Sequence, residues 1–157
     1  MRLALFQPDI PQNLGAAIRL TACLGVELEV IEPCGFPLSD PAIRRAALDY
    51  GARARVTRHA GWADFLSHPA RGDGRLLLFS TRGARRFTDF AFESGDTLLF
   101  GQESAGAPEY VHAAADARLL VPLTPGARSL NLTVSAAIGL AEALRQTGGF
   151  PEAGQTG

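Results

Sequence analysis

The sequence predicts an α/β fold in which a parallel sheet carries helices on both faces. Short, continuously apolar segments alternate with helix-like segments along almost the whole chain. Continuous apolar runs are typical of strands that are buried on both faces, and strands that alternate with helices favour parallel pairing. A chain of 157 residues fits one domain with its own core. We expect that domain to span residues 1–149.

The first strand and helix of this pattern follow directly on the N-terminus. Arg2–Gln7 is an apolar run that suits a strand, and Pro8 and Pro11 end it. Asn13 is placed to cap the following helix, and Gly25 is placed to end it.

The remaining elements follow from the same alternation. Further strands are expected at Val26–Ile31, Arg53–Thr57, Arg75–Ser80, Thr97–Phe100 and Ala117–Val121. Further helices are expected at Pro41–Leu48, Trp62–Leu66, Glu109–Ala115 and Leu132–Gln146. The connection from residue 80 to 96 is long, partly basic and without a clear helix, which favours a functional role.

The last helix is rich in small residues and is apolar nearly all round, so it is expected to be buried. Its small residues are Ser135, Ala136, Ala137, Gly139, Ala141 and Ala143. Residues 150–157 follow two glycines and are expected to form a flexible tail.

Composition narrows the class of protein. With 46% hydrophobic and 20% charged residues the chain is that of a globular protein. It has no signal peptide and no apolar run of about 18 residues, so we expect a cytoplasmic protein that does not enter a membrane. Cys23 and Cys34 are interpreted as small buried residues rather than as a disulfide or a zinc site.

The charge is unevenly placed, although the net charge is only −1. Ten of the fifteen arginines lie between Arg44 and Arg86, against three acidic residues in the same stretch, and the chain has no lysine. This excess is compatible with a solvated face, or with an anionic partner that the planar guanidinium binds well. His59 lies within this stretch, directly after a run of basic residues, and is interpreted as a contact to such a partner or as a structural residue.

Three loops are expected at the carboxyl ends of strands, where parallel sheets bind ligands. They are Ser80–Arg86, Gly101–Pro108 and Pro122–Asn131. The second loop, GQESAGAP, lacks the Lys-Ser/Thr pair of a phosphate-binding loop. It also lacks the first glycine of a hydrolase nucleophile elbow. By itself it is compatible with a plain turn before a helix.

Together with two other segments this loop gives a specific resemblance. NLGAAIR at Asn13–Arg19, GQESAG at Gly101–Gly106 and RSLNL at Arg128–Leu132 resemble the three motifs of the SPOUT methyltransferases. The segments LFQPDIPQNLGAAIRLTACLG and RSLNLTVSAAIGLAEALRQ, with VTRH at Val56–His59, are similar to the TrmL family, also called YibK. The resemblance covers nearly the whole chain.

The resemblance implies a SPOUT fold with a deep C-terminal trefoil knot and a homodimer that forms through the knot region. It implies S-adenosylmethionine as the cofactor, S-adenosylhomocysteine as the product, and no metal. Phe79, Gly101, Val121 and Ser129 are expected to bind the cofactor, mostly through backbone groups. A side chain at position 101 would then collide with the ligand.

The resemblance further implies transfer of a methyl group to the 2′-hydroxyl of the wobble nucleotide, position 34, of leucine tRNAs. Arg19 would activate that hydroxyl or a neighbouring phosphate, or act as an electrostatic positioner. Asn13 would shape the site or cap its helix, and Glu103 would orient motif 2. Ser129 and Asn131 would line the substrate side. The family's Arg-Gly-Leu-Pro in motif 2 is Ala-Gly-Ala-Pro here, with alanine at positions 105 and 107. Loss of the basic side chain would weaken or redirect the contact to RNA, which bears on the substrate more than on the reaction. Modification of another RNA position, or RNA binding without turnover, are the alternative functions.

Overall fold

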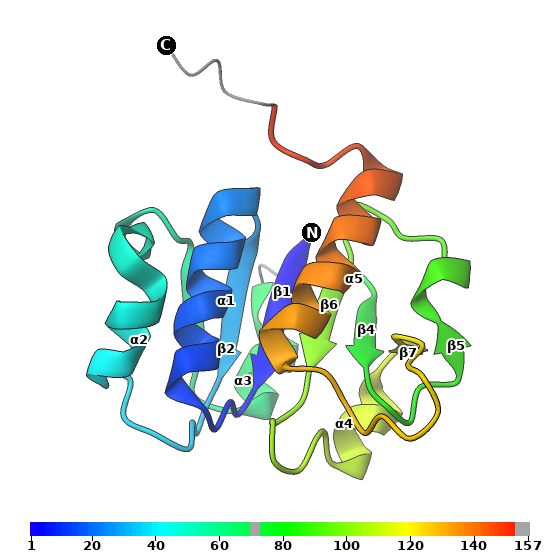
Figure 1. Cartoon of the computed structure of the whole chain (residues 1–157), viewed down its shortest axis with the longest axis horizontal. Coiled ribbons are helices and arrows are strands. Elements are labelled where there is room, and N and C mark those ends of the chain that lie inside the picture. Colours follow the sequence, from blue (N-terminus) through cyan, green and yellow to red (C-terminus); the bar gives the residue numbers. More distant parts are fainter. Residues whose placement is uncertain (70–72, 153–157) are drawn as a thin grey trace.

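The described residues form one parallel sheet of seven strands in the order β3-β2-β1-β6-β4-β7-β5 (Figure 1). The computed structural model describes residues 1–69 and 73–152. The strands are Arg2–Phe6 (β1), Glu27–Ile31 (β2), Val56–His59 (β3), Leu76–Phe79 (β4), Arg85–Arg86 (β5), Thr97–Phe100 (β6) and Ala117–Leu120 (β7). The α-helices are Pro11–Leu24 (α1), Pro41–Ala47 (α2), Trp62–Ser67 (α3), Glu109–Ala114 (α4) and Leu132–Thr147 (α5). Short 3-10 helices span Leu48–Ala52 (η1) and Phe87–Asp89 (η3).

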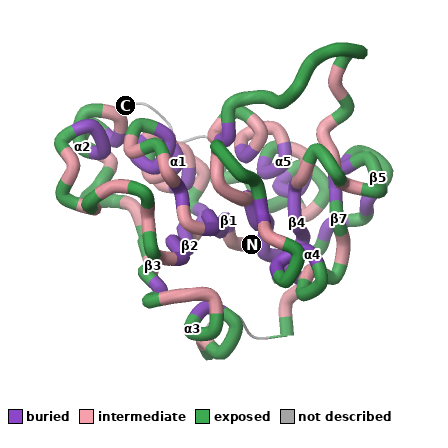
Figure 2. Tube along the Cα trace, turned by 90° about the horizontal axis from the view of Figure 1, so that it is seen from below, coloured by how far each residue is buried: buried purple, intermediate pink, exposed green. Residues whose placement is uncertain are grey.

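The two faces of the sheet pack against different helices. Figure 1 shows α1, α2 and α5 in front of the sheet and α3 and α4 behind it. Because successive side chains of a strand point to opposite faces, Leu3 and Leu5 join the front core while Ala4 and Phe6 join the rear core. Figure 2 shows the buried strands between helices whose outer surfaces are exposed. The predicted parallel α/β architecture with helices on both faces is confirmed.

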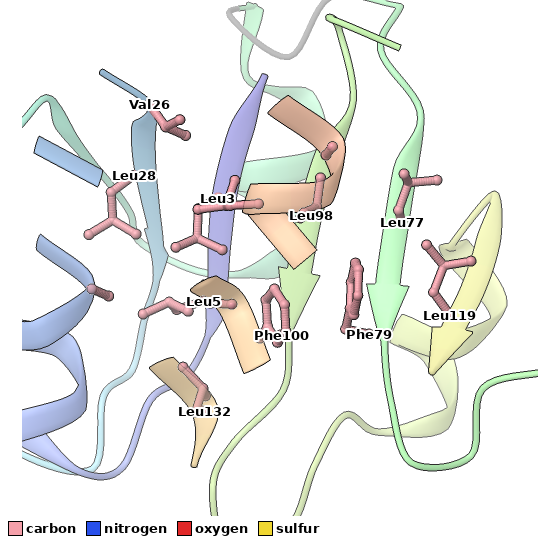
Figure 3. Packing of buried hydrophobic residues seen from close by; sticks show 14 of the residues in the cluster. Leu3, Leu5, Val26, Leu28, Leu77, Phe79, Leu98, Phe100, Leu119 and Leu132 are labelled. Carbon is pink, nitrogen blue, oxygen red and sulfur yellow. The ribbon is translucent and has the colours of Figure 1, made fainter. Parts of the chain in front are cut away.

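Helix α5 packs only one of its faces against the sheet. Gly139 lies on the ring of Phe79, where an added Cβ would be 2.8 Å from the ring edge. That ring in turn stacks on Phe100 with centroids 4.9 Å apart (Figure 3). On the outer face Val134 is 48% exposed, and Ala141 is exposed as well. The prediction that this helix is buried is therefore wrong for its outer face, which a single chain leaves uncovered.

Helix α1 begins earlier than the sequence suggested. Pro11 occupies its first turn and Ile10 precedes it without a capping side chain. Asn13 therefore lies inside the helix, and the prediction that it caps α1 is wrong. Its side chain makes contacts to two other segments instead, which are described with the site below. Gly25 ends the helix as predicted, with a left-handed backbone at φ 68°.

The structure differs from the predicted elements in two further segments, both exposed and rich in arginine. Strand β3 begins at Val56, three residues later than predicted, because the turn of η1 extends to Arg53. Strand β5 and helix η3 lie in the connection for which no element was predicted. Strand β5 is the exposed pair Arg85–Arg86 at the sheet edge, so no apolar pattern marks it. The predicted tail at 150–157 lies mostly outside the described residues.

His59 is a structural residue of the rear core rather than a surface contact. It is 1% exposed and its Nε2 is hydrogen-bonded to Glu29, which is also buried. Arg2 approaches Glu29 at 3.4 Å and provides the compensating charge. The buried positions predicted for the two cysteines are wrong, since Cys23 is exposed on α1 and Cys34 is half-buried in a loop.

Replacing Gly15 by alanine is expected to destabilise the fold by about 1–3 kcal/mol, through overpacking between α1 and α2. An added Cβ would lie 2.4 Å from the carbonyl oxygen of Ile43 and 2.7 Å from Cβ of Ala46. Urea denaturation followed by circular dichroism measures the change. The matched control is Gly51→Ala, where an added Cβ meets nothing within 4 Å. Equal stabilities of the two variants would contradict the prediction.

Candidate active site

A cavity of about 710 Å³ opens at the carboxyl ends of β4, β6 and β7. Parallel strands end at the same edge of a sheet, so the loops that follow them converge there. All three predicted loops contribute to the wall, through residues 80–82, 101–107 and 123 with 128–131. Ile10 and Asn13 of the loop and helix after β1 complete one side. Cavities of roughly 300–1,000 Å³ are typical of small-molecule sites.

The four residues predicted to bind the cofactor all line this cavity. They are Phe79, Gly101, Val121 and Ser129. The ring of Phe79 belongs to the front core under α5, as Figure 3 shows. Phe79 therefore turns its side chain away from solvent, in agreement with contacts through its backbone. Ser129 is exposed and lies in the irregular segment between β7 and α5.

Gly101 is required by its own loop. Gln102 and Gly106 exchange two backbone hydrogen bonds of 2.9 Å and close the loop into a tight ring. A Cβ at position 101 would lie 2.4 Å from the carbonyl carbon of Gly106 and 2.5 Å from N of Ala107. The expected clash of such a side chain therefore occurs with the protein backbone itself.

A chain of amide hydrogen bonds joins the three motif segments at the cavity rim. The Oδ1 of Asn131 accepts from the backbone N–H groups of Thr133 and Val134, at 2.9 and 3.2 Å, and so caps α5. Its Nδ2 donates to Oδ1 of Asn13 at 2.9 Å. The Nδ2 of Asn13 then donates to Oε1 of Glu103 at 3.0 Å. Each amide has one accepting and one donating end. Because the cap of α5 uses the oxygen of Asn131, it fixes the donor-to-acceptor direction of every hydrogen bond in this row.

Glu103 ends this chain beside a second carboxylate, Asp9. Burial, and then hydrogen bonding to Asp9, raise the pKa of Glu103. Hydrogen bonding to Glu103, and further bonds to Ser104, lower the pKa of Asp9. As the pH falls, Glu103 therefore takes up a proton first and Asp9 remains ionised.

Arg19 is the one predicted site residue that does not line the cavity in the described part of the chain. It lies on the exposed side of α1, six residues beyond Asn13, with its guanidinium 5.5 Å from the centre of the Tyr50 ring. Six residues of helix separate the two side chains by about 9 Å along the axis. The structure thus brings Asn13, Glu103 and Asn131 together and leaves Arg19 outside.

Sequence reasoning missed three polar residues of this region. Arg82 lines the cavity and donates to the carbonyl oxygen of Ala107 at 3.4 Å. His112 of α4 also lines it, and Asp9 lies behind Glu103. The position of Arg82 in a loop after a strand was a usable signal. The sequence of α4 gave no signal that His112 belongs to the site, because one histidine in a short helix has no distinctive spacing.

Comparison with known proteins now assigns the family. The chain matches the profile described as the SpoU rRNA Methylase family over residues 1–141. The chain belongs to the SpoU methylase family. The predicted enzyme class, an RNA methyltransferase, is thereby confirmed.

Similar members of the SpoU family share most of the length of this chain. The tRNA (cytidine(34)-2'-O)-methyltransferase of Beijerinckia indica is 53% identical over 146 residues, which are 93% of this chain and 91% of the relative. The enzyme of the same name from Ancylobacter novellus is 51% identical over 154 residues, or 98% of each chain.

Solved structures of SpoU-type enzymes agree with this fold. A structure that concerns 2-OH methylation of C/U34 on tRNA has a TM-score of 0.88 and 43% identity, and the match covers 92% of this chain and 94% of that one. The SpoU methyltransferase AviRb from Streptomyces viridochromogenes, in complex with the cofactor AdoMet, has a TM-score of 0.84 and 26% identity, covering 93% of this chain and 60% of that one. The deep knot remains a prediction, because strand order does not determine how the chain threads.

The cavity fits S-adenosylmethionine, the cofactor named for AviRb. Its volume suits a ligand of that size, and its wall at Gly101 is backbone without a side chain. Among the described residues, no group of three or more His, Cys, Asp or Glu side chains is placed to hold a metal ion. None of the helices in residues 1–69 and 73–152 is long and apolar enough to cross a membrane.

Replacing His112 by leucine is expected to stabilise the fold, and more so at pH 5 than at pH 7. His112 is 4% exposed, and its Nε2 has no hydrogen-bond partner among the described residues. An unpaired buried polar atom costs about 1–3 kcal/mol, which leucine removes. Burial lowers the pKa of His112, so the unfolded chain binds its proton more readily. The folded state therefore loses stability as the pH falls below the unfolded value.

Urea denaturation of His112→Leu and the unmodified protein at both pH values tests this expectation. The difference in unfolding free energy between them grows toward pH 5. A difference that is the same at both pH values would contradict a buried, neutral His112.

Proposed function

We propose that this chain transfers the methyl group of S-adenosylmethionine to the 2′-hydroxyl of the wobble nucleotide, position 34, of leucine tRNAs, as a cytoplasmic homodimer. The observation that carries the proposal is the identity of 53% and 51%, over at least 91% of each chain, to enzymes named tRNA (cytidine(34)-2'-O)-methyltransferase. At such identity the relatives' substrate position is the best guide to that of this chain. The assignment to leucine tRNAs rests on the TrmL resemblance of the motif segments.

The arrangement of polar groups supports ribose methylation. When bound, the cofactor would supply a methyl group on a positively charged sulfur, which would pass to the ribose oxygen with loss of the carbon–sulfur bond and release of the hydroxyl proton to solvent. The protein's part is to align the hydroxyl and to stabilise the oxygen as its proton leaves. Asn13, Glu103 and Asn131 hold a fixed polar rim for this purpose, and backbone at Gly101 faces the cofactor.

Two arginines at the cavity support an RNA substrate. Arg82 and Arg128 line it, and both are exposed, so both can contact phosphate groups. Arg82 would exchange its contacts to the carbonyl oxygen of Ala107, at 3.4 Å, and to Glu109, at 3.9 Å, for a phosphate. A planar guanidinium pairs with two phosphate oxygens at once. At position 105 the family has a basic residue and this chain has alanine. Arg82 and Arg128 line the same cavity as Ala105 and offer basic contacts there instead.

The homodimer is supported by the exposed face of α1 and α5. These helices lie side by side over one face of the sheet (Figure 1). Ile10, Leu130 and Val134 are 41%, 38% and 48% exposed, and the first two line the cavity. An apolar surface at a cavity mouth is typical of an interface. A second copy seated there brings its own exposed α1 toward this cavity, so Arg19 can serve the site of its partner.

The experiment that tests the proposal is transfer of labelled methyl groups to purified leucine tRNA, followed by nuclease mapping of the label. The expected result is label at nucleotide 34. The matched control is the same tRNA with a 2′-deoxy nucleotide at position 34, which offers no hydroxyl and is expected to remain unlabelled. Label at another nucleotide would favour a different RNA position, and no label in any tRNA would refute the proposal.

A further inference from the structure

The side chain of Asp9 is hydrogen-bonded to the motif 2 loop, although Asp9 belongs to none of the three motif segments. Its Oδ1 accepts from the backbone N–H of Glu103 at 3.2 Å. Its Oδ2 accepts from the N–H of Ser104 at 3.3 Å and from the Ser104 hydroxyl. In return, the N–H of Asp9 donates to Oε2 of Glu103 at 2.9 Å. Each acidic side chain thus accepts the backbone N–H of the other, and we call Asp9 and Glu103 the carboxylate clasp.

The clasp fixes the orientation of the Glu103 carboxylate at the cavity rim. The backbone N–H of Asp9 holds one carboxylate oxygen of Glu103, and the other oxygen accepts from the Nδ2 of Asn13 at 3.0 Å. The Asp9 carboxylate in turn holds the backbone from which the Glu103 side chain projects. The bond from Asn131 to Asn13 continues the same chain to the start of α5. Without the clasp, Glu103 can rotate, and the amides lose the acceptor at their far end.

Asp9 is itself held from behind by the loop after β2. The N–H of Gly35 donates to the carbonyl oxygen of Pro8 at 2.9 Å. A Cβ at position 35 would lie 2.8 Å from Cβ of Asp9, so only glycine allows this approach. Asp9 therefore transmits the position of the β1 and β2 loops to the loop after β6.

We propose that Asp9 is a positioning residue for methyl transfer, which acts through Glu103 to hold Asn13 and Asn131 in the orientation that receives the ribose. Asp9 does not line the cavity itself in the described part of the chain, so it is not a catalytic residue. The inference rests on the proposed function, because the rate that Asp9 sets is that of ribose methylation.

The charge state of the clasp gives the role a measurable signature. Glu103 accepts two hydrogen bonds, so the working form is the ionised one. Asp9 contributes to the raised pKa of Glu103, after burial. Glu103 also influences the titration of Cys34, in the loop after β2. Burial first, then Glu32 and Glu103, raise the pKa of Cys34 to about 11, so it stays neutral at lower pH. The fall of kcat toward low pH, which is the acid limb of the pH–rate profile, therefore reports the protonation of Glu103.

The test is Asp9→Asn, which keeps the shape but turns an N–H₂ group toward backbone donors. We expect kcat for RNA methylation to fall on the order of tenfold, as for a lost charged hydrogen bond. KM for RNA and Kd for S-adenosylhomocysteine stay within about twofold, because the paired Gln102 and Gly106 hold the cofactor loop. The acid limb moves to lower pH, since Glu103 loses the neighbour that raised its pKa. Asp9→Glu keeps the charge, so its acid limb stays in place.

The matched control is Asp40→Asn, which replaces the helix cap of α2 by an equally good one and is expected to change neither constant. An activity-independent readout is the pH titration of the Glu103 side-chain carboxyl, followed by ¹³C NMR with S-adenosylhomocysteine bound and assigned with Glu103→Gln. Its midpoint should fall in Asp9→Asn. An unmoved midpoint, or a kcat loss matched by an equal loss of S-adenosylhomocysteine affinity, would overturn the role of Asp9. An unmodified protein that methylates no RNA refutes the proposed function instead, and the titration still decides the clasp.

Discussion

Replacing Arg19 by alanine is expected to abolish methyl transfer while S-adenosylhomocysteine still binds. The guanidinium matches the arginine of motif 1, and stabilisation of the ribose oxygen as its proton leaves, or of a neighbouring phosphate, is worth about 10²- to 10⁴-fold in rate. Arg19 lies outside the cavity that would hold the cofactor, so Kd should stay within about twofold. Labelled methyl transfer measures the first quantity and calorimetry measures the second.

Two variants control for loss of charge alone. Arg145→Ala removes an exposed arginine of α5 that is paired with Glu142 at 2.8 Å, and it should retain turnover. Arg19→Lys keeps the charge but not the planar fork, and should recover only part of the rate. Full turnover by Arg19→Ala would remove this residue from the mechanism.

Replacing Gly101 by alanine is expected to weaken S-adenosylhomocysteine binding roughly tenfold to hundredfold, as overpacking of about 1–3 kcal/mol implies. The added Cβ would meet backbone atoms at 2.4 and 2.5 Å, and backbone cannot rotate away as a side-chain tip can. The loop must open, and the wall of the cavity opens with it. Calorimetry with S-adenosylhomocysteine measures the loss.

The control for Gly101→Ala is Gly95→Ala, where the nearest contact of an added Cβ is an ordinary 3.8 Å. Circular dichroism of both variants separates a local change at the loop from unfolding. If Gly101→Ala binds S-adenosylhomocysteine as tightly as the unmodified protein, the loop after β6 does not form the cofactor wall.

Combining these two variants tests where Arg19 acts. In a heterodimer of Arg19→Ala and Gly101→Ala chains, an arginine that serves its partner completes one intact site, which contains Gly101 from one copy and Arg19 from the other. An arginine that serves its own chain completes none. Recovered turnover after coexpression with two purification tags would therefore place Arg19 in the partner's cavity.

The strands and the location of the site could be predicted from the sequence, because both depend on local patterns. Runs such as Leu76–Phe79 are apolar at every position since both faces of the sheet are covered. The motif loops follow such runs, so their convergence was predictable from parallel pairing. The roles assigned to individual residues remain predictions.

The contacts within the site were less predictable, because they join residues far apart in the chain. Nothing near Asp9 indicates that its partners are Glu103 and Ser104, which lie 94 and 95 residues away. The position of Arg19 relative to Asn13 depends on where α1 begins. The expected cap at Asn13 misplaced that start, since Pro11 already suits a first helical turn.

The amide chain at the rim also constrains how the protein reaches its native state. Its bonds close loops of 90 residues between Asn13 and Glu103 and of 118 residues between Asn13 and Asn131. Contacts of such separation form slowly, because the loop entropy is lost before the contact is gained. The site therefore cannot assemble on a chain that lacks α5, and newly made protein gains a complete rim only after its C-terminal helix has been synthesised and docked.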